Sequence, residues 1–188
     1  IVTLFEFRLH PLGPEVLSGL IVHPFADSRE LLPQFRRLVA PAPAALPIWA
    51  VMRQAPPLPF IPAEWHGKEV LIFAACYSGD MKDGEKAVKP LRALGKPIVD
   101  VIGPHPFTGW QAAFDPLLTP GARNYWKSHD FADLSDGAIK AIVDAASRLP
   151  GPECEVFIAH VGGAMGRVAP DAMAWSNREA HFIMNAHT

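Results

Sequence analysis

This chain of 188 residues has little net charge, few cysteines and no long apolar run. Its formal net charge is -2, so no excess of positive charge is available to attract nucleic acid or an anionic membrane. No apolar stretch approaches the roughly 18 residues that a membrane-spanning helix needs, and no signal peptide is recognisable. The sequence therefore predicts neither a nucleic-acid partner nor a membrane partner, and we expect a cytoplasmic protein.

The usual signatures of catalytic and cofactor sites are also missing. Cys76 and Cys154 form no C-x-x-C pair and are expected to be buried free thiols. Residues 162–166 are rich in glycine but lack the G-x-G-x-x-G spacing of a dinucleotide loop. The eight histidines give no H-x-x-x-H pair on a helix, and no serine nucleophile motif is present. We therefore expect no metal site and no cofactor-binding motif in this chain, and no catalytic residue can be assigned.

Proline, by contrast, is abundant, and the 20 prolines gather between apolar segments. Because proline interrupts helices and central strands, residues 41–47, 56–62 and 104–106 are expected to be stiff connectors. Alternating or continuous apolar segments predict strands, and apolar residues at helical spacing predict helices. The expected strands are 3–9, 16–23, 46–53, 69–77, 98–102, 123–128, 156–161, 164–168 and 180–187, and the expected helices are 28–39, 81–94, 107–114 and 136–149.

From residue 16 the elements follow the order strand, helix, strand, strand, helix, strand. That order is the ferredoxin-like split β-α-β pattern, and a second, less complete round follows it. We therefore expect an α+β fold with a broad antiparallel sheet and helices packed on one face. The other face needs a partner, because it would otherwise expose apolar strand surface to water. In the isolated chain this exposed face favours dimerisation.

A few polar side chains are embedded in the expected strands. Strand alternation places Tyr125 and Lys127 on one face and Trp126 on the other. Lys127 could aim at an anionic or carbonyl group, or its stem could cover an aromatic neighbour while its ammonium reaches solvent. His160 lies at a strand end beside glycines, where a hydrogen-bonded structural histidine is the alternative to a functional one.

Asn185 and His187 form the best candidate pair, because two polar residues share one face of an otherwise apolar strand. A solvent-facing sheet edge would explain them equally well.

Several stretches resemble berberine-bridge-enzyme-like FAD-dependent oxidases. Residues 1–13 resemble the exit strand of that family's flavin-binding domain, and residues 125–128 resemble its Lys-Ser strand. The Gly-Gly turn at 162–163 has a counterpart in the family. Residues 175–178 and 182–187 resemble its late Phe-Pro-His-Arg segment and the strand that follows. The resemblance covers nearly the whole chain, in the family's order.

The resemblance implies an enzyme of two parts. One domain binds FAD, and the other lays an antiparallel sheet over the isoalloxazine and forms the substrate pocket. The chain resembles the second part alone. It would be a single substrate-binding domain over 1–188, with the exit strand at 1–13, a ferredoxin-like half at 14–104 and a second half at 105–188. FAD would be bound mainly by a missing domain of the same polypeptide, and the isolated chain would be inactive.

The last strand departs from the family's pattern. The family's substrate-facing Glu or Gln corresponds to Asn185, and a Lys two residues earlier corresponds to Ile183. Asn185 can orient a substrate but cannot act as a carboxylate base. The resemblance then implies a base at Lys127, at His187, at His160 or in a segment beyond Thr188.

Our leading hypothesis is the substrate-binding domain of a flavin-dependent oxidase, which passes a hydride from an alcohol, amine or sugar carbon to FAD. Trp126 would form an apolar wall of the small-molecule pocket. The alternative is a stand-alone ferredoxin-like module that binds a small ligand or dimerises. A complete small catalytic domain is the weakest reading, because no nucleophile, base and orienting residue come together in local motifs. The polar contacts of the leading hypothesis are Tyr125, Lys127, His160, Asn185 and His187.

Overall fold

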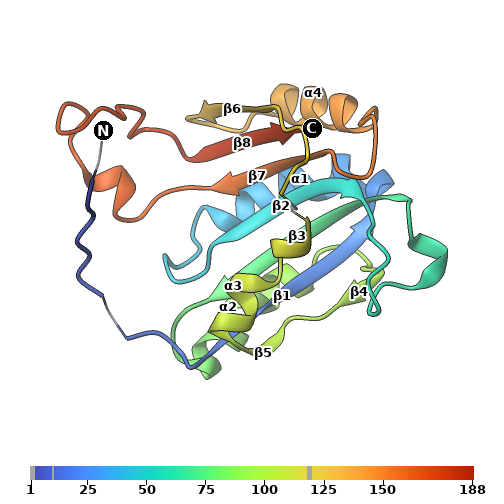
Figure 1. Ribbon diagram of the computed structural model, residues 1–188, viewed down its shortest axis with the longest axis horizontal. Helices are drawn as coiled ribbons and strands as arrows, with labels where there is room; N and C mark the ends of the chain where they lie inside the picture. Colours follow the sequence, from blue (N-terminus) through green and yellow to red (C-terminus); the bar gives the residue numbers. More distant parts are fainter. Residues whose placement is uncertain (1–2, 10, 118–119) are drawn as a thin grey trace.

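The structure is a computed structural model that describes residues 3–9, 11–117 and 120–188. Within these residues one sheet of eight strands runs in the order β4-β1-β3-β2-β7-β8-β6, and β5 also pairs with β1 (Figure 1). All the strand pairs are antiparallel. The strands are β1 Glu15–Pro24, β2 Ile48–Gln54, β3 Glu69–Tyr77, β4 Val99–Asp100, β5 Gly103–Pro106, β6 Trp126–Phe131, β7 Glu155–His160 and β8 Phe182–His187. The helices are α1 Ser28–Val39, α2 Met81–Arg92, α3 Phe107–Ala112 and α4 Asp136–Ala146, with short 3-10 turns η1 Phe25–Asp27, η2 Ala63–Trp65, η3 Asp115–Leu117 and η4 Met165–Arg167.

Two split β-α-β units share this sheet. In the first, α1 connects β1 to β2 and β3 lies between those strands, while α2 leads to β4 on the far side of β1. In the second, α4 connects β6 to β7 and β8 lies between them. The pairing of β2 with β7 joins the two units. The predicted α+β fold with a ferredoxin-like split unit is therefore confirmed.

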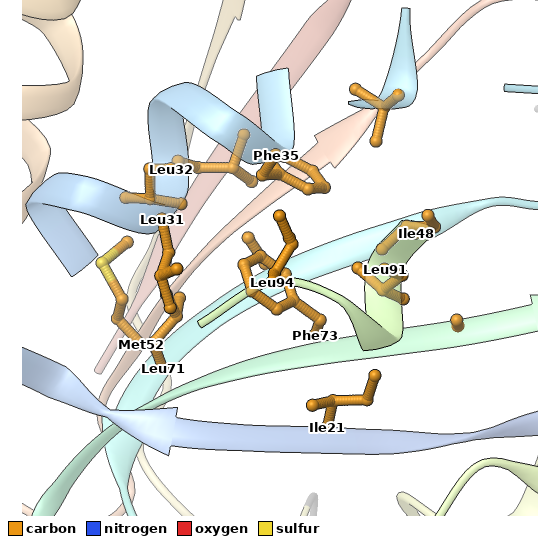
Figure 2. Packing of buried hydrophobic residues seen from close by; sticks show 14 of the residues in the cluster. Ile21, Leu31, Leu32, Phe35, Ile48, Met52, Leu71, Phe73, Leu91 and Leu94 are labelled. Carbon is orange, nitrogen blue, oxygen red and sulfur yellow. The ribbon is translucent and has the colours of Figure 1, made fainter. Parts of the chain in front are cut away.

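The three longer helices, α1, α2 and α4, cover one face of the sheet with the main hydrophobic core. Figure 2 shows Leu31 and Phe35 of α1 and Leu91 of α2 pointing toward strand residues that include Phe73. The rings of Phe35 and Phe73 stack with centroids 5.4 Å apart. The short helix α3 instead belongs to the opposite face, where it lines a cavity. No described helix combines the length and apolarity that crossing a membrane requires.

Local chemistry explains where two of the helices, α2 and α4, begin. The Asp80 side chain accepts a hydrogen bond from the backbone N–H of Lys82 at 2.9 Å, and the Ser135 hydroxyl accepts one from Ala138 at 3.2 Å. Both are N-cap interactions. Helix α1 begins at Ser28 and continues through Pro33, although the Asp27 side chain makes no capping bond. Its bounds are those expected from the spacing of apolar residues.

Three predicted strands differ from the structure. Residues 164–168 contain η4 instead of a strand. Residues 3–9 form no strand and leave Phe5 and Leu9 largely exposed, because no described strand lies beside them to complete a ladder (Figure 1). Ile1, Val2 and His10 of the expected exit strand lie outside the described residues. The strand expected at 98–102 is shorter, and the chain adds a further strand, β5. Its two prolines argued against a strand in the sequence, but proline is tolerated in a strand at the edge of a sheet.

The position of Phe73 gives a test of this core. Phe73 is fully buried against Phe35, so Phe73→Ala removes a large side chain and leaves a cavity. We expect the free energy of unfolding, measured by urea titration, to fall by about 3–5 kcal/mol. The matched control is Phe5→Ala, because Phe5 is 70% exposed, and it should change stability by less than about 0.5 kcal/mol. Equal losses in the two variants would contradict this packing.

Candidate functional site

The face of the sheet that the long helices leave uncovered carries the candidate site. Side chains alternate along each strand, so residues in register on neighbouring strands lie side by side on the same face. One row on this face consists of Arg53, Glu155, His187 and Trp126, from β2, β7, β8 and β6. The next row consists of Val51, Phe157, Asn185 and Ser128, and the third consists of Trp49, Ala159, Ile183 and Asp130.

A cavity of about 910 Å³ lies over this face, at the upper end of the range for small-molecule sites. Its floor is formed by strand residues, and its sides come from the connector 56–61, from α3 and from the segment before β6. The connector also packs on the sheet through a second hydrophobic cluster that includes Ile61 and Ile72. Most of the lining is apolar, with aromatic side chains from Trp49, Phe60, Trp110, Phe114, Trp126 and Phe157.

Trp49 and Phe157 lie side by side among the residues that line the cavity. Their rings stack across β2 and β7 with centroids 5.0 Å apart and planes 7° apart. Trp49 remains 46% exposed, which is unusual for a tryptophan in the middle of a sheet. Its exposed part offers aromatic surface to a ligand that enters the cavity.

The polar row at one end of the cavity is nearly buried. A guanidinium nitrogen of Arg53 lies 2.8 Å from the Glu155 carboxylate, and these side chains are 10% and 18% exposed. Arg53 also donates to the carbonyl oxygens of Pro152 at 3.1 Å and Gln54 at 3.3 Å. Each nitrogen of the guanidinium therefore already has a protein partner, and Arg53 is poorly placed to hold an anionic ligand.

His187 lies on the other side of Glu155. Its Nε2 is 3.4 Å from Oε1 of Glu155, and its ring stacks on Trp126 with centroids 4.4 Å apart. The edge of Phe157 also contacts the ring, at 5.5 Å between centroids. Nε2 of His187 and Oδ1 of Asn185 are buried without a formed hydrogen bond within the described residues. Of these two residues, His187 lines the cavity, whereas Asn185 lies on the same sheet face but is not among the lining residues.

A second histidine, His105 on β5, lines the cavity. Its Nδ1 is 2.9 Å from the carbonyl oxygen of Ser18. A carbonyl only accepts hydrogen bonds, so this contact places the hydrogen on Nδ1 and leaves Nε2 as an acceptor in the neutral ring. Sequence reasoning missed His105, because its position between two prolines concealed the strand that carries it.

The structure brings together only two of the five predicted site residues. Asn185 and His187 share one face of β8, as expected, and that face is the one under the cavity, which His187 lines. Lys127 pairs with Ala186 and His160 pairs with Phe182, so strand alternation puts both on the opposite, helix-covered face. Burial, followed by the nearby His181, lowers the pKa of His160.

Tyr125 is on that helix-covered side as well, since its ring lies 5.6 Å from the Lys127 ammonium. The expectation of one shared polar surface is therefore wrong for Tyr125, Lys127 and His160. A substrate-binding role for Asn185 and His187 stays a prediction. Trp126, expected as an apolar wall, does line the cavity.

The residues that sequence reasoning missed on this face are Trp49, Arg53 and Glu155. Trp49 and Arg53 lie in a predicted strand and Glu155 directly precedes one, but only the register between β2 and β7 reveals that Arg53 meets Glu155. The two cysteines are free, as expected; Cys154 is buried, whereas Cys76 is only half-buried, and its partial burial raises the pKa of the Cys76 thiol.

Comparison with known proteins finds one similar sequence and several similar folds among oxidoreductases. No family model matches the chain. An FAD-linked oxidoreductase from Dictyostelium discoideum is 23% identical over 184 residues, which cover 97% of this chain and 38% of that protein. The solved structure of BBE-like #28 from Arabidopsis thaliana superposes with a TM-score of 0.72 at 11% identity, over 94% of this chain and 37% of that one. The structure of 6-hydroxy-D-nicotine oxidase from Arthrobacter nicotinovorans gives a TM-score of 0.68 at 13% identity, over 96% and 39%.

The resemblance to berberine-bridge-enzyme-like FAD-dependent oxidases is thereby confirmed in sequence and in fold. At 11–13% identity the solved structures share the fold of this chain, while residue roles do not transfer. The chain spans about two fifths of the length of the proteins it matches.

The buried ion pair gives a prediction for this site. Arg53→Met leaves the Glu155 carboxylate without its partner in a nearly buried position. We expect the free energy of unfolding at neutral pH to fall by about 3 kcal/mol in urea titration. The control is Arg29→Met, which removes the exposed ion pair with Asp144 and should leave stability nearly unchanged. A negligible loss in Arg53→Met would show that solvent reaches Glu155 freely.

Proposed function

We propose that this chain is the substrate-binding domain of a flavin-dependent oxidoreductase, and that its uncovered sheet face forms one wall of the substrate pocket. The observation that carries the proposal is a largely apolar cavity of about 910 Å³ over that face, in a fold shared with FAD-linked oxidases. We propose the whole of 1–188 as this domain, with 1–13 leading into it.

The chain's residues fit the neighbourhood of a flavin ring. The stacked rings of Trp49 and Phe157 give the floor an aromatic surface, and the surrounding cavity is apolar enough to exclude water from a reaction there. The sequence has no glycine-rich loop for a pyrophosphate. We therefore propose that another domain of the same polypeptide holds most of the FAD. When bound, the flavin supplies the acceptor for a hydride.

The remaining chemistry of the pocket falls to side chains of this domain. The aromatic floor positions a small-molecule substrate by stacking. Asn185 shares the sheet face under the cavity with His187, and His187 lines the cavity, so a hydroxyl or amine group of the substrate is proposed to meet this end of the face. An alcohol, an amine or a sugar carbon bearing such a group is the proposed hydride donor. Without a hydride acceptor the isolated chain should be inactive.

The exposed Trp49 also supports a second candidate function, a module that binds a small aromatic ligand or a second copy of itself through the same face. In this case a longer protein would be purified without flavin. The two candidates therefore differ in a property that is simple to measure.

The test uses the full-length protein that contains this chain, purified and recorded for flavin absorbance. We expect a yellow protein whose flavin spectrum survives Trp49→Ala, since that change affects only the substrate wall. The KM for an oxidised substrate should rise tenfold or more, which corresponds to about 1.4 kcal/mol of lost binding.

Trp175→Ala is the control, because Trp175 stacks with Arg178 outside the cavity; its KM should stay within twofold of the wild-type value. A colourless full-length protein would contradict the flavin proposal. An unchanged KM in Trp49→Ala would contradict the assignment of this face to the substrate.

A further inference from the structure

We propose that His187 accepts the substrate's proton in this cavity, with Glu155 and Arg53 as the positioning residues that hold its imidazole. The inference rests on the proposed function for the identity of the hydride acceptor. It deepens that function by naming the group that takes the proton. It also gives a role to the charged side chains of Arg53 and Glu155, which lie beside an otherwise apolar cavity.

Three contacts from three directions fix the imidazole of His187. Glu155 lies 3.4 Å from Nε2, Trp126 stacks on a ring face at 4.4 Å, and Phe157 meets the ring at 89°. A ring held in this way cannot exchange its two nitrogens without losing the contact to the carboxylate. Since Nε2 is buried and faces Glu155, Nδ1 is the nitrogen left for the cavity that His187 lines.

Glu155 in turn is held by Arg53. The guanidinium binds Oε2 of Glu155 at 2.8 Å and anchors itself on the carbonyl oxygens of Pro152 and Gln54. Oε1 therefore remains turned toward Nε2 of His187. A carboxylate in this position favours the tautomer with its hydrogen on Nε2 and supplies a countercharge when the ring takes up a second proton.

The other basic side chains suggested from sequence do not reach the cavity. Lys127 and His160 lie on the helix-covered face. His105 does line the cavity, but its Nδ1 is bound to the neutral carbonyl of Ser18, which offers no countercharge comparable to a carboxylate. Among the described histidines that line the cavity, His187 is thus the one with a carboxylate partner.

The proton step balances for an alcohol or an amine. The O–H or N–H bond of the substrate breaks, and its proton moves to Nδ1 of His187. The electron pair of that bond becomes the second bond between the heteroatom and its carbon. The hydrogen on that carbon leaves with both electrons as a hydride, for which the flavin of the proposed function is the acceptor. The products are a carbonyl or imine and an imidazolium beside Glu155.

The first test reads the tautomer of His187 directly, by 15N NMR of the histidine-labelled 188-residue chain above the histidine titration range. We expect the hydrogen of neutral His187 on Nε2. In Glu155→Gln that preference should weaken. The control is Glu69→Gln, because Glu69 lies on β3, the strand that pairs with the edge of β2 away from β7, and there the preference should be unchanged. A neutral His187 with its hydrogen on Nδ1 would overturn the assignment. This measurement needs no flavin.

The second test uses the full-length flavoprotein, mixed without oxygen with whichever of benzyl alcohol, benzylamine and D-glucose bleaches its flavin. His187→Gln should slow the bleaching by about 10²–10⁴-fold, and Glu155→Gln by at least tenfold. His129→Gln, which alters a histidine on the helix-covered face of β6, should stay within twofold of the wild-type rate. Thermal unfolding of each variant shows whether it is folded.

The pH profile separates a proton acceptor from a structural residue. Because a general base must be unprotonated to act, the wild-type rate should rise with pH, and His187→Gln should lose that rising limb. The other titratable groups around the cavity are Glu155 on β7, Arg53 on β2, His105 on β5, Glu153 before β7 and Arg123 before β6. A rising limb retained in His187→Gln, or bleaching within twofold of wild type, would overturn the proposal. A colourless full-length protein would refute the proposed function. The NMR measurement would still test whether Glu155 sets the tautomer of His187.

Discussion

The antiparallel pairing of β2 with β7 is the interaction on which the rest of the structure depends. It joins two split β-α-β units into one sheet and sets the register across the joint. Through that register Trp49 reaches Phe157 and Arg53 reaches Glu155. A slip of one residue would put Trp49 and Arg53 on the opposite face from Phe157 and Glu155 and would break both contacts. The floor of the cavity and its polar end therefore come from a single set of backbone hydrogen bonds.

The two faces of the sheet solve different physical problems. On one face, three amphipathic helices bury a continuous apolar core that includes Phe35 and Phe73. On the other face, a connector and α3 cover the margins and leave a cavity with an exposed Trp49. An apolar surface kept open in this way costs stability in water. Such a cost is expected where a ligand or another domain completes the burial.

The nearly buried pair of Arg53 and Glu155 also costs stability for the sake of position. A buried ion pair adds little net stability, because desolvation of both charges offsets their attraction. The pairing of Arg53 with Glu155 is better understood as a constraint on position, since Arg53 leaves Oε1 of Glu155 facing His187. The row fixes one imidazole between a carboxylate and an aromatic ring, which is the arrangement that proton transfer at a defined nitrogen requires.

Sequence reasoning located most of the elements, because periodicity and caps are local properties. Strand β3 matches its expected bounds, and α2 and α4 begin at the expected residues, directly after the caps Asp80 and Ser135. Asn185 and His187 were placed on a common face, since two residues that are two apart on a strand always share one. The failure for Lys127 and His160 is non-local, because which face a strand turns to the cavity depends on its neighbours. The Arg53–Glu155 pair spans about a hundred residues and leaves no local signature.

The central claim is that the uncovered face of this sheet lies against a flavin in the longer protein. A crystal structure of the full-length protein tests it most directly. The account predicts an isoalloxazine ring facing the cavity that Trp49, Phe157 and His187 line. A flavin bound on the helix-covered side, or a cavity turned to solvent in a protein without flavin, would contradict it.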